Sequence, residues 1–294
     1  MSSNRIVTVQ CPARPASTGE PRADGISSGE IRFAFGKNWS EFLAHFNEDR
    51  LRAAQQSLTD FLGMSTLSGK SFLDIGCGSG LFSLAAHSLG ALKVVSFDYD
   101  ANSVSCAESL RDKAGAPKNW IVQRGSVLDR EFLRSLGTFD LVYSWGVLHH
   151  TGEMWQAIRN AASLVAPSGL LCIALYNRTP QSEHWRKVKK FYCQSSKPVK
   201  LGLDTYYVVK QRVLRNLVHG RNPFKAGFQN FGRERGMHWL ADLRDWLGGY
   251  PYEFATVDEV FSFMKQEFPS SSLVNIKTEP GLGNNWFLYR NNAE

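Results

Sequence analysis

Residues 72–81 read Phe72-Leu73-Asp74-Ile75-Gly76-Cys77-Gly78-Ser79-Gly80-Leu81, and they are the most informative part of the sequence about its fold. An apolar run carrying one acid leads into three glycines at alternate positions, and an apolar helical pattern starts at Leu81. Glycine allows a ligand to approach the backbone closely, and the unpaired N–H groups at a helix start attract a carboxylate or a phosphate. The stretch therefore predicts a strand, a ligand-binding turn and the start of a helix.

Strand and helix patterns alternate on both sides of this turn. We expect strands over 71–75, 94–98, 120–123, 139–144 and 170–176, with helices over 81–89, 102–114 and 153–165. Such alternation is typical of right-handed βαβ crossovers and a parallel sheet. A helix over 257–268 precedes two strands, 272–278 and 285–290, and the six residues 279–284 between them are too few for a crossover helix. We predict an α/β fold: a Rossmann-like, mostly parallel sheet with a C-terminal antiparallel hairpin strand, an N-terminal helical cover and a helical cap insertion.

The chain of 294 residues is long enough for one core of about 200 residues with additions. Residues 1–30 are rich in Ser, Gly and Pro and are predicted to form a flexible tail. Residues 31–70 form the helical cover, because apolar side chains recur there at helical spacing. The core comprises 71–177 and 256–294, and residues 178–255 form an insertion over the carboxyl edge of the sheet.

Composition excludes several classes of protein. Hydrophobic residues make up 43% and charged residues 21%, which excludes wholesale disorder, and no apolar run is long enough for a membrane span. The five cysteines are scattered, which favours reduced thiols over a disulfide framework or a zinc site. The N-terminus lacks the apolar region of a secretory signal. We therefore expect a cytoplasmic protein without a transmembrane segment; the oligomeric state stays open.

A second acid follows the next predicted strand. That strand ends in Phe97-Asp98-Tyr99-Asp100, about 20 residues past the glycine turn, where a carboxylate suits the hydroxyl groups of a ribose. A dinucleotide-binding turn needs a third small residue at position 81, where this chain has Leu, so the spacing disfavours NAD. The alternatives are that the glycines form only a tight turn and that Asp98 is a turn or N-cap residue, although Asp100 is better placed to cap the following helix.

These residues resemble the class I methyltransferases that use S-adenosylmethionine, in particular the ubiquinone-type O-methyltransferases. Residues 139–151 (FDLVYSWGVLHHT) are similar to the fourth-strand motif of that family, and Trp39 with the segment 46–51 is similar to its N-terminal cover. Many relatives carry Asp at the position of Ser126. The resemblance implies S-adenosylmethionine as cofactor, with the methionine end at 74–80, the methionine carboxylate at Arg50 and the ribose at Asp98. The implied cofactor-binding residues are Arg50, Asp74, Gly76, Cys77, Gly78, Gly80, Asp98, Tyr99, Ser126, Val127, Ser144 and Trp145.

Two adjacent histidines follow the predicted fourth strand. An imidazole suits the removal of a proton from an oxygen nucleophile at neutral pH. His150 occupies the position at which the quinone-type relatives carry a histidine, so we expect it to be the general base, with His149 as second choice. The alternative is that these histidines pack or cap the next helix. Some relatives hold a divalent metal with acids beside this histidine, but the corresponding positions here are Gly146 and His149, so no metal is predicted.

The insertion carries the basic character of the chain. Residues 178–235 contain 14 Lys and Arg, including Lys187, Lys189 and Lys190, and three acids, a net charge of +11; the whole chain is 34 − 27 = +7, so the remainder is −4. Such a charge attracts an anionic substrate, an acidic membrane surface or nucleic acid, and the interspersed aromatic residues favour a helical unit that also contacts lipid. The alternative is a merely solvated basic face.

Polar and aromatic residues near the end of the insertion are candidates for contact with a substrate. With the cover residue, the predicted substrate-binding residues are Trp39, Arg235, Asp242, Arg244 and Tyr252. The alternative is a structured connector. The sequence as a whole predicts a methyltransferase acting on an oxygen of a small-molecule or lipid-linked, anionic acceptor. An RNA (tRNA) methyltransferase is the first alternative, because of the basic insertion, and a non-catalytic cofactor-binding protein is the second.

Overall fold

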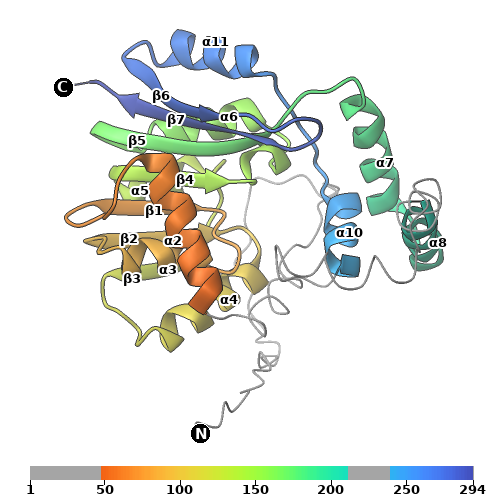
Figure 1. The fold of residues 1–294 in the computed structure, drawn as a ribbon, viewed down its shortest axis with the longest axis horizontal. Helices are drawn as coiled ribbons and strands as arrows, with labels where there is room; N and C mark the ends of the chain where they lie inside the picture. The colour runs from red at the N-terminus through yellow and green to blue at the C-terminus, as the bar shows by residue number, and fades with distance from the viewer. Residues whose placement is uncertain (1–47, 211–238, 294) are drawn as a thin grey trace, which may run out of the picture.

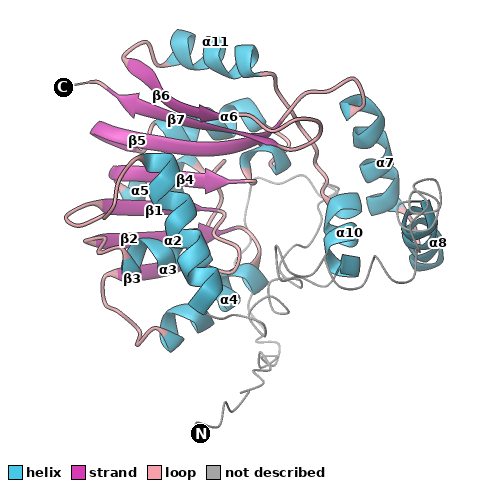
Figure 2. Cartoon of the chain, viewed as in Figure 1, coloured by secondary structure: helices cyan, strands magenta, loops and turns pink. Residues whose placement is uncertain are grey.

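The protein is described by a computed structural model that covers residues 48–210 and 239–293, and side chains at 239–242 and 245 are not described. Helices flank both faces of one seven-stranded sheet with the strand order β3-β2-β1-β4-β5-β7-β6 (Figure 1, Figure 2). The strands are β1 Ser71–Ile75, β2 Lys93–Asp98, β3 Trp120–Arg124, β4 Phe139–Trp145, β5 Val165–Tyr176, β6 Ser271–Lys277 and β7 Asn284–Asn291. The helices are α2 Glu48–Leu62, α3 Leu81–Ser88, α4 Ala101–Lys113, α5 Arg130–Leu136, α6 Met154–Ala162, α7 Ser182–Gln194, α8 Lys197–Val208, α10 Trp239–Gly248 and α11 Val257–Glu267, with a 3₁₀ turn η1 at Leu148–His150.

The pairing of the strands confirms the predicted fold class. Strands β3, β2, β1, β4 and β5 pair in parallel in that order, and β7 lies antiparallel to both β5 and β6. The predicted hairpin of the last two strands is therefore confirmed. One boundary is corrected: β5 begins at Val165, although Pro167-Ser168-Gly169 predicts a turn before Leu170. Val165 pairs with Phe139, the register then shifts, and Ser168 takes a positive φ of 59° within this bulge.

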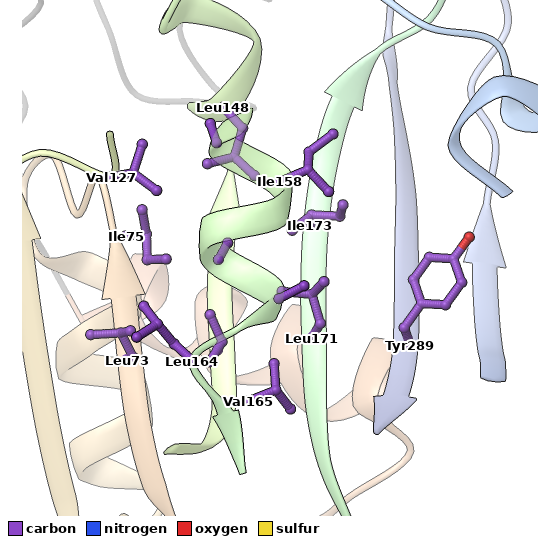
Figure 3. Packing of buried hydrophobic residues seen from close by; sticks show 14 of the residues in the cluster. Leu73, Ile75, Val127, Leu148, Ile158, Leu164, Val165, Leu171, Ile173 and Tyr289 are labelled. Atoms are coloured by element: carbon purple, nitrogen blue, oxygen red, sulfur yellow. The ribbon is translucent and has the colours of Figure 1, made fainter. Parts of the chain in front are cut away.

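The sheet has an apolar core on each face because its buried strands alternate in side-chain direction. On β5, Leu171, Ile173 and Leu175 belong to one cluster, whereas Cys172 belongs to the other. The first of these clusters lies against α6 and α11, and Figure 3 shows its members from β1 and β5 on either side of α6. The second is closed by α2, α3 and α4.

The described part of the insertion consists of three helices. Helices α7, α8 and α10 lie beyond the carboxyl ends of the parallel strands (Figure 1). They share a small apolar cluster of Tyr192, Tyr207 and Leu247. Asp204 of α8 accepts hydrogen bonds from Tyr192 of α7 at 2.9 Å and from Arg244 of α10 at 2.8 Å, so the three helices are tied together. The predicted tail and the first part of the predicted cover lie outside the described residues, and the proposed domain boundaries stay a prediction.

Lys189 corrects the expectation that this lysine belongs to the basic residues of the insertion that attract a partner. Its side chain is fully buried in α7, with 0% exposed. The ammonium group donates to the carbonyl oxygen of Trp246 and lies 3.9 Å from the centroid of the Trp246 ring and 4.9 Å from that of Tyr252. Lys189 is therefore a structural residue of the insertion and cannot meet a soluble partner, whereas Lys187 and Lys190 are exposed.

This burial predicts different costs for two neighbouring lysines. Lys189→Ala leaves the Trp246 carbonyl without its donor and removes the cation from two rings, so we expect the free energy of unfolding to fall by about 1–2 kcal/mol. Lys190→Ala, at an exposed position, should change it by less than about 0.5 kcal/mol. Urea unfolding of both variants measures the difference. Equal values for the two would show that Lys189 is not buried as described.

The described residues also bear on two predictions made from composition, the absence of a membrane span and the state of the cysteines. Within 48–210 and 239–293, no helix combines the length and the apolar character needed to span a bilayer. In the same ranges, Cys77, Cys106, Cys172 and Cys193 are free thiols.

Candidate functional site

The glycine turn joins β1 to α3 at the carboxyl edge of the sheet. Gly76, Gly78 and Gly80 all have positive φ values, 71°, 54° and 79°. The N–H groups of Gly76 and Cys77 donate to the carbonyl oxygen of Phe97 at the end of β2, at 2.8 and 3.1 Å. A Cβ atom at Gly76 would overlap the side chain of Val147, and one at Gly80 would lie 3.0 Å from Cβ of Ala107. Glycine is therefore required at both positions for steric as well as conformational reasons.

A matched pair of glycines separates these two reasons. Gly69 has φ +73°, close to that of Gly76, but an added Cβ there meets nothing within 4 Å. We expect Gly76→Ala to lower the free energy of unfolding by about 1–2 kcal/mol more than Gly69→Ala, because only Gly76→Ala adds a clash to the backbone strain. Urea unfolding measures both costs. Similar costs would show that Val147 moves aside and that the turn has room for a side chain.

Asp98 ends β2 beside this turn. Its carboxylate accepts hydrogen bonds from the backbone N–H of Gly78 at 3.0 Å and of Asp100 at 2.9 Å. Burial raises the pKa of Asp98 to about 6, against the opposing effect of these bonds, so the group is mostly ionised at neutral pH. Asp100, in contrast, caps α4 by accepting from the N–H of Asn102 at 2.8 Å, as predicted. Asp98 is thus held as an oriented anion at the rim of the glycine turn.

Asp74 faces the protein interior. Its carboxylate accepts from the Ser83 hydroxyl at 2.5 Å; Ser83 in turn accepts from Ser96 at 2.7 Å, and Ser96 accepts from the Trp120 indole at 2.8 Å. Burial raises the pKa of Asp74 to about 7. This buried chain connects β1, α3, β2 and β3 beneath the turn. The Asp74 side chain therefore links the strands and the helix below the glycine turn through buried hydrogen bonds. Its direct contact with a cofactor stays a prediction.

The other predicted cofactor residues fall into two groups. Ser144 and Cys77 are buried, and Ser144 donates to the carbonyl oxygen of Ile75 at 3.1 Å. Val127 is also buried, whereas Tyr99 is 41% exposed, with the Arg124 guanidinium 5.9 Å from its ring centroid. These residues line the ends of β1 to β4.

Ser126 and Arg50 are two further residues predicted to bind the cofactor. The hydroxyl of Ser126 accepts from the N–H of Leu128 at 3.2 Å. Arg50, in the first turn of α2, is half-buried, and this burial lowers the pKa of its guanidinium.

An aromatic row crosses the ends of β4, β5 and β7. In the strand register, Ala174 of β5 lies opposite Trp145 of β4 on one side and Trp286 of β7 on the other. The two indole rings are edge to face, with their centroids 5.7 Å apart. Both indole N–H groups are buried and have no hydrogen-bond partner among the described residues, and the same holds for Oδ1 of Asn284. Trp286 and Asn284 have no motif around them, so the sequence offered no signal for placing them here.

The two histidines have different hydrogen-bonding states. Nδ1 of His149 accepts from the backbone N–H of Tyr176 at 3.2 Å, so the proton of its neutral ring lies on Nε2. Nδ1 of His150 lies 2.6 Å from the carbonyl oxygen of Pro251, which can only accept, so His150 carries its proton on Nδ1 and a lone pair on Nε2. Burial lowers the pKa of His149 well below its usual value and that of His150 to about 3. Both rings are therefore neutral at physiological pH, and the basic lone pair of the His150 ring is on Nε2.

The end of the insertion returns to these histidines. The Tyr252 ring is buried 5.0 Å from that of Tyr176, which itself lies 3.9 Å from the ring of His149. The backbone N–H of Glu253 donates to the carbonyl oxygen of His149 at 2.9 Å. The loop thus holds the histidine turn in place.

Of the residues predicted to bind a substrate, the structure describes the side chains of Arg244 and Tyr252. Arg244 is ion-paired with Asp204 inside the insertion and Tyr252 is buried, so their roles in substrate binding stay predictions. Trp39, Arg235 and the side chain of Asp242 lie outside the described residues. Among the residues that are described, no group of three or more His, Cys, Asp or Glu could hold a metal ion.

Comparison with known proteins identifies relatives. A family model described as a methyltransferase domain matches residues 44–245. The ubiquinone biosynthesis O-methyltransferase of Methylobacterium sp. (strain 4-46) is 33% identical over 146 residues, which is 48% of this chain and 56% of that protein. The protein of the same name from Coxiella burnetii (strain RSA 331 / Henzerling II) is 30% identical over 132 residues, 45% of this chain and 51% of that protein. The chain spans about half the length of these curated relatives.

Solved structures share the fold at low identity. An O-methyltransferase family protein from Burkholderia thailandensis has a TM-score of 0.52 at 12% identity, covering 87% of this chain and 61% of that one. PKMT2 from Rickettsia typhi, solved in complex with AdoHcy, has a TM-score of 0.54 at 12% identity, covering 80% and 52%. At these identities the likeness concerns the fold alone.

Proposed function

Because the chain belongs to the methyltransferase domain family, we propose that it transfers a methyl group from S-adenosylmethionine to an oxygen atom of a small or lipid-linked acceptor. The predicted resemblance to methyltransferases is confirmed by the family match. The relatives named ubiquinone biosynthesis O-methyltransferase support oxygen as the accepting atom. The observation that carries the proposal is the pairing of a glycine turn with an oriented Asp98 at one sheet edge.

The residues at this edge fit a cofactor that joins an amino acid to a nucleoside. The turn leaves no room for side chains at Gly76 and Gly80, and the carboxylate of Asp98 is oriented by two backbone N–H groups. The backbone of this turn would hold the methionine end and Asp98 the ribose hydroxyls. S-adenosylmethionine, when bound, supplies a methyl group already activated on a sulfonium.

His150 is proposed as the general base. Its Nδ1–H bond to Pro251 fixes the tautomer, so the lone pair that would take a proton from the acceptor hydroxyl is on Nε2. Any general base removes the proton of a phenol, whose pKa is about 10, more readily than that of an aliphatic alcohol, and a phenol is therefore the first acceptor to test. His149 cannot share the role in its present tautomer, because its Nδ1 already accepts from Tyr176.

The aromatic row supports the same class of acceptor. The indole rings of Trp145 and Trp286 offer flat apolar surfaces beside two N–H donors, and Asn284 offers an oxygen. Buried polar atoms normally have hydrogen-bond partners, so these three atoms suit a ligand with oxygen substituents on a flat ring. A phenolic compound with a second oxygen group satisfies both the donors and the base.

A methyl-transfer assay tests the proposal. The protein is incubated with methyl-labelled S-adenosylmethionine and a panel of phenols, aliphatic alcohols and amines, and with fractionated cell extract. We expect label in phenols or in a lipid-soluble extract fraction, as an alkali-stable ether. Label only in amines, or calorimetric binding of NAD in place of S-adenosylmethionine, would refute the proposal.

An RNA methyltransferase is the second candidate. The exposed lysines of the insertion favour it, since phosphate contacts depend on such charges. Label in the RNA fraction of the same extract would select it, and its binding to RNA should weaken steeply with salt.

A further inference from the structure

The loop between α10 and α11 lies across the turn that carries the two histidines. Nδ1 of His150 donates to the carbonyl oxygen of Pro251 at 2.6 Å, and the backbone N–H of Glu253 donates to the carbonyl oxygen of His149 at 2.9 Å. The carboxylate of Glu253 reaches further along, where it accepts from the backbone N–H of Met154 at 3.0 Å. These hydrogen bonds tie the loop both to the histidine turn and to the helix that follows it.

Glu253 caps helix α6 from a distant part of the chain. Met154 is the first residue of α6, and a backbone N–H at this position has no partner within its own helix. The side chain of Glu153, at the N-cap position itself, makes no capping hydrogen bond in the described structure. The carboxylate of Glu253, 99 residues away from Met154, supplies the missing acceptor, and a carboxylate is favourable at the start of a helix.

The carbonyl group of Pro251 depends on its neighbours for its position. Proline has no backbone N–H, so Pro251 itself cannot donate a bond that would anchor it. Tyr252 holds the loop to β5, because its ring lies 5.0 Å from that of Tyr176. Glu253 holds the loop to α6, the helix that continues from the histidine turn. Loss of the Glu253 carboxylate would therefore release the loop on the side of the histidines and leave its packing on β5.

We propose that Glu253 is a positioning residue for His150: its bond to the start of α6 holds the Pro251 carbonyl against Nδ1 of the imidazole. It acts through the loop and not by contact with the acceptor. When the carbonyl is displaced, the neutral ring exchanges between its two tautomers, and in one of them the proton lies on Nε2, which then cannot act as a base. The effect on turnover rests on the proposed function, whereas the effect on the tautomer does not.

Nitrogen-15 NMR of the full chain with labelled histidines tests the proposal directly. The signals that vanish in His150→Ala identify those of His150. At neutral pH the unmodified protein should show His150 as a single neutral tautomer with its proton on Nδ1. Glu253→Ala should show signals averaged between the two tautomers, because the ring has lost its fixed acceptor. A general loss of stability in a protein that remains folded would not move these signals.

Turnover provides the second readout. Glu253→Ala should lower kcat at least about tenfold and leave the affinity for S-adenosylmethionine nearly unchanged, because it displaces the base and not the glycine turn. Glu253→Gln keeps a side-chain oxygen that can accept from Met154, so it should recover most of the activity and the Nδ1 tautomer. Glu253→Asp, whose carboxylate is withdrawn by one methylene group, should fall between the two. It takes the place of Glu253→Ala if that variant does not fold.

Asp140→Ala is the matched control. The Asp140 carboxylate also accepts from a backbone N–H, that of Ser71 at 2.7 Å, but it does so at the amino ends of β1 and β4, the edge of the sheet opposite the histidines. Its removal should lower the free energy of unfolding and leave the His150 tautomer and kcat unchanged.

Three outcomes would overturn the proposal. These are a proton on Nε2 of His150 in the unmodified protein, an unchanged tautomer in both Glu253→Ala and Glu253→Asp, and an equal change of the tautomer in Asp140→Ala. If the unmodified protein transfers no methyl group but the tautomer responds to Glu253 as expected, the proposed function is wrong and the positioning role of Glu253 is confirmed.

Discussion

His150→Ala is expected to lower kcat at least about 100-fold while the affinity for S-adenosylmethionine stays nearly unchanged. The structure gives the physical reason: the bond from Nδ1 to the Pro251 carbonyl orients the ring and leaves the lone pair on Nε2. Removing the imidazole therefore removes the group proposed to take the proton, without altering the glycine turn. Single-turnover assays with a phenolic acceptor, together with calorimetry of the cofactor, measure the two effects.

The matched control for this prediction is the neighbouring histidine. His149→Ala deletes a fully buried ring that accepts from Tyr176, so it should lower the free energy of unfolding as well as activity. Added imidazole should restore part of the activity of His150→Ala but none in His149→Ala. A stable His150→Ala protein with full activity would contradict the proposed role.

The pH dependence offers an independent test of His150. Burial lowers its pKa to about 3, and a lowered pKa means that the neutral, proton-accepting form persists down to that pH. We therefore expect kcat/KM to show no decline from this group between about pH 8 and pH 5, whereas an imidazole of ordinary pKa would give a decline near pH 6.5. A decline near pH 6.5 that disappears in His150→Ala would show that the ring is more solvated than the structure indicates.

Asp98→Ala is expected to weaken the binding of S-adenosylmethionine by about 1–3 kcal/mol, a factor of about 5 to 150. The carboxylate would bind the ribose hydroxyls, and it also accepts from the N–H of Gly78, so its loss affects the ligand and the turn together. Isothermal calorimetry with the cofactor and with its demethylated product measures the change.

Asp100→Ala is the control for Asp98. This residue lies two positions along, but its side chain caps α4 through the N–H of Asn102. Its replacement should cost about 1 kcal/mol of stability and leave the affinity for the cofactor unchanged. Unchanged affinity in Asp98→Ala, or equal losses in the two variants, would remove Asp98 from the cofactor site.

The fold was largely predictable because its determinants are local. Buried strands and amphipathic helices have different side-chain periods, so the order β1-α3-β2-α4-β3 could be read along the chain. Helix α5 was not predicted: Arg130–Leu136 is short and mostly polar, and its signal is the N-cap Asp129, whose carboxylate accepts from the N–H groups of Glu131 and Phe132. The start of β5 was misplaced because Pro167-Ser168-Gly169 looks like a turn, yet the bulge there is held by pairing with β4.

The candidate site was predictable only where a motif marks it. The glycines form a turn whose backbone geometry depends on residues close in sequence, and Asp98 ends the next strand. The residue types and their spacing therefore indicate where they lie in the fold. Lys189 was counted among the cations that would attract a partner, although the carbonyl oxygen of Trp246, 57 residues away, accepts from it in the interior. Trp286 joins Trp145 only because β5 and β7 pair across Ala174. Such contacts depend on how distant segments pack.

Residue types and their spacing are enough to specify a glycine turn between a buried strand and a helix, an acid at the end of the next strand and two histidines after the fourth strand. These follow from the spacing of glycine, apolar and acidic residues, which constrains the local backbone. The two histidines, in contrast, are distinguished by contacts that exist only in the folded protein. The tautomer of each is set by a backbone group far along the chain, the Tyr176 N–H, 27 residues from His149, and the Pro251 carbonyl, 101 residues from His150. No local pattern records which of those groups a ring will meet, because folding alone brings them together.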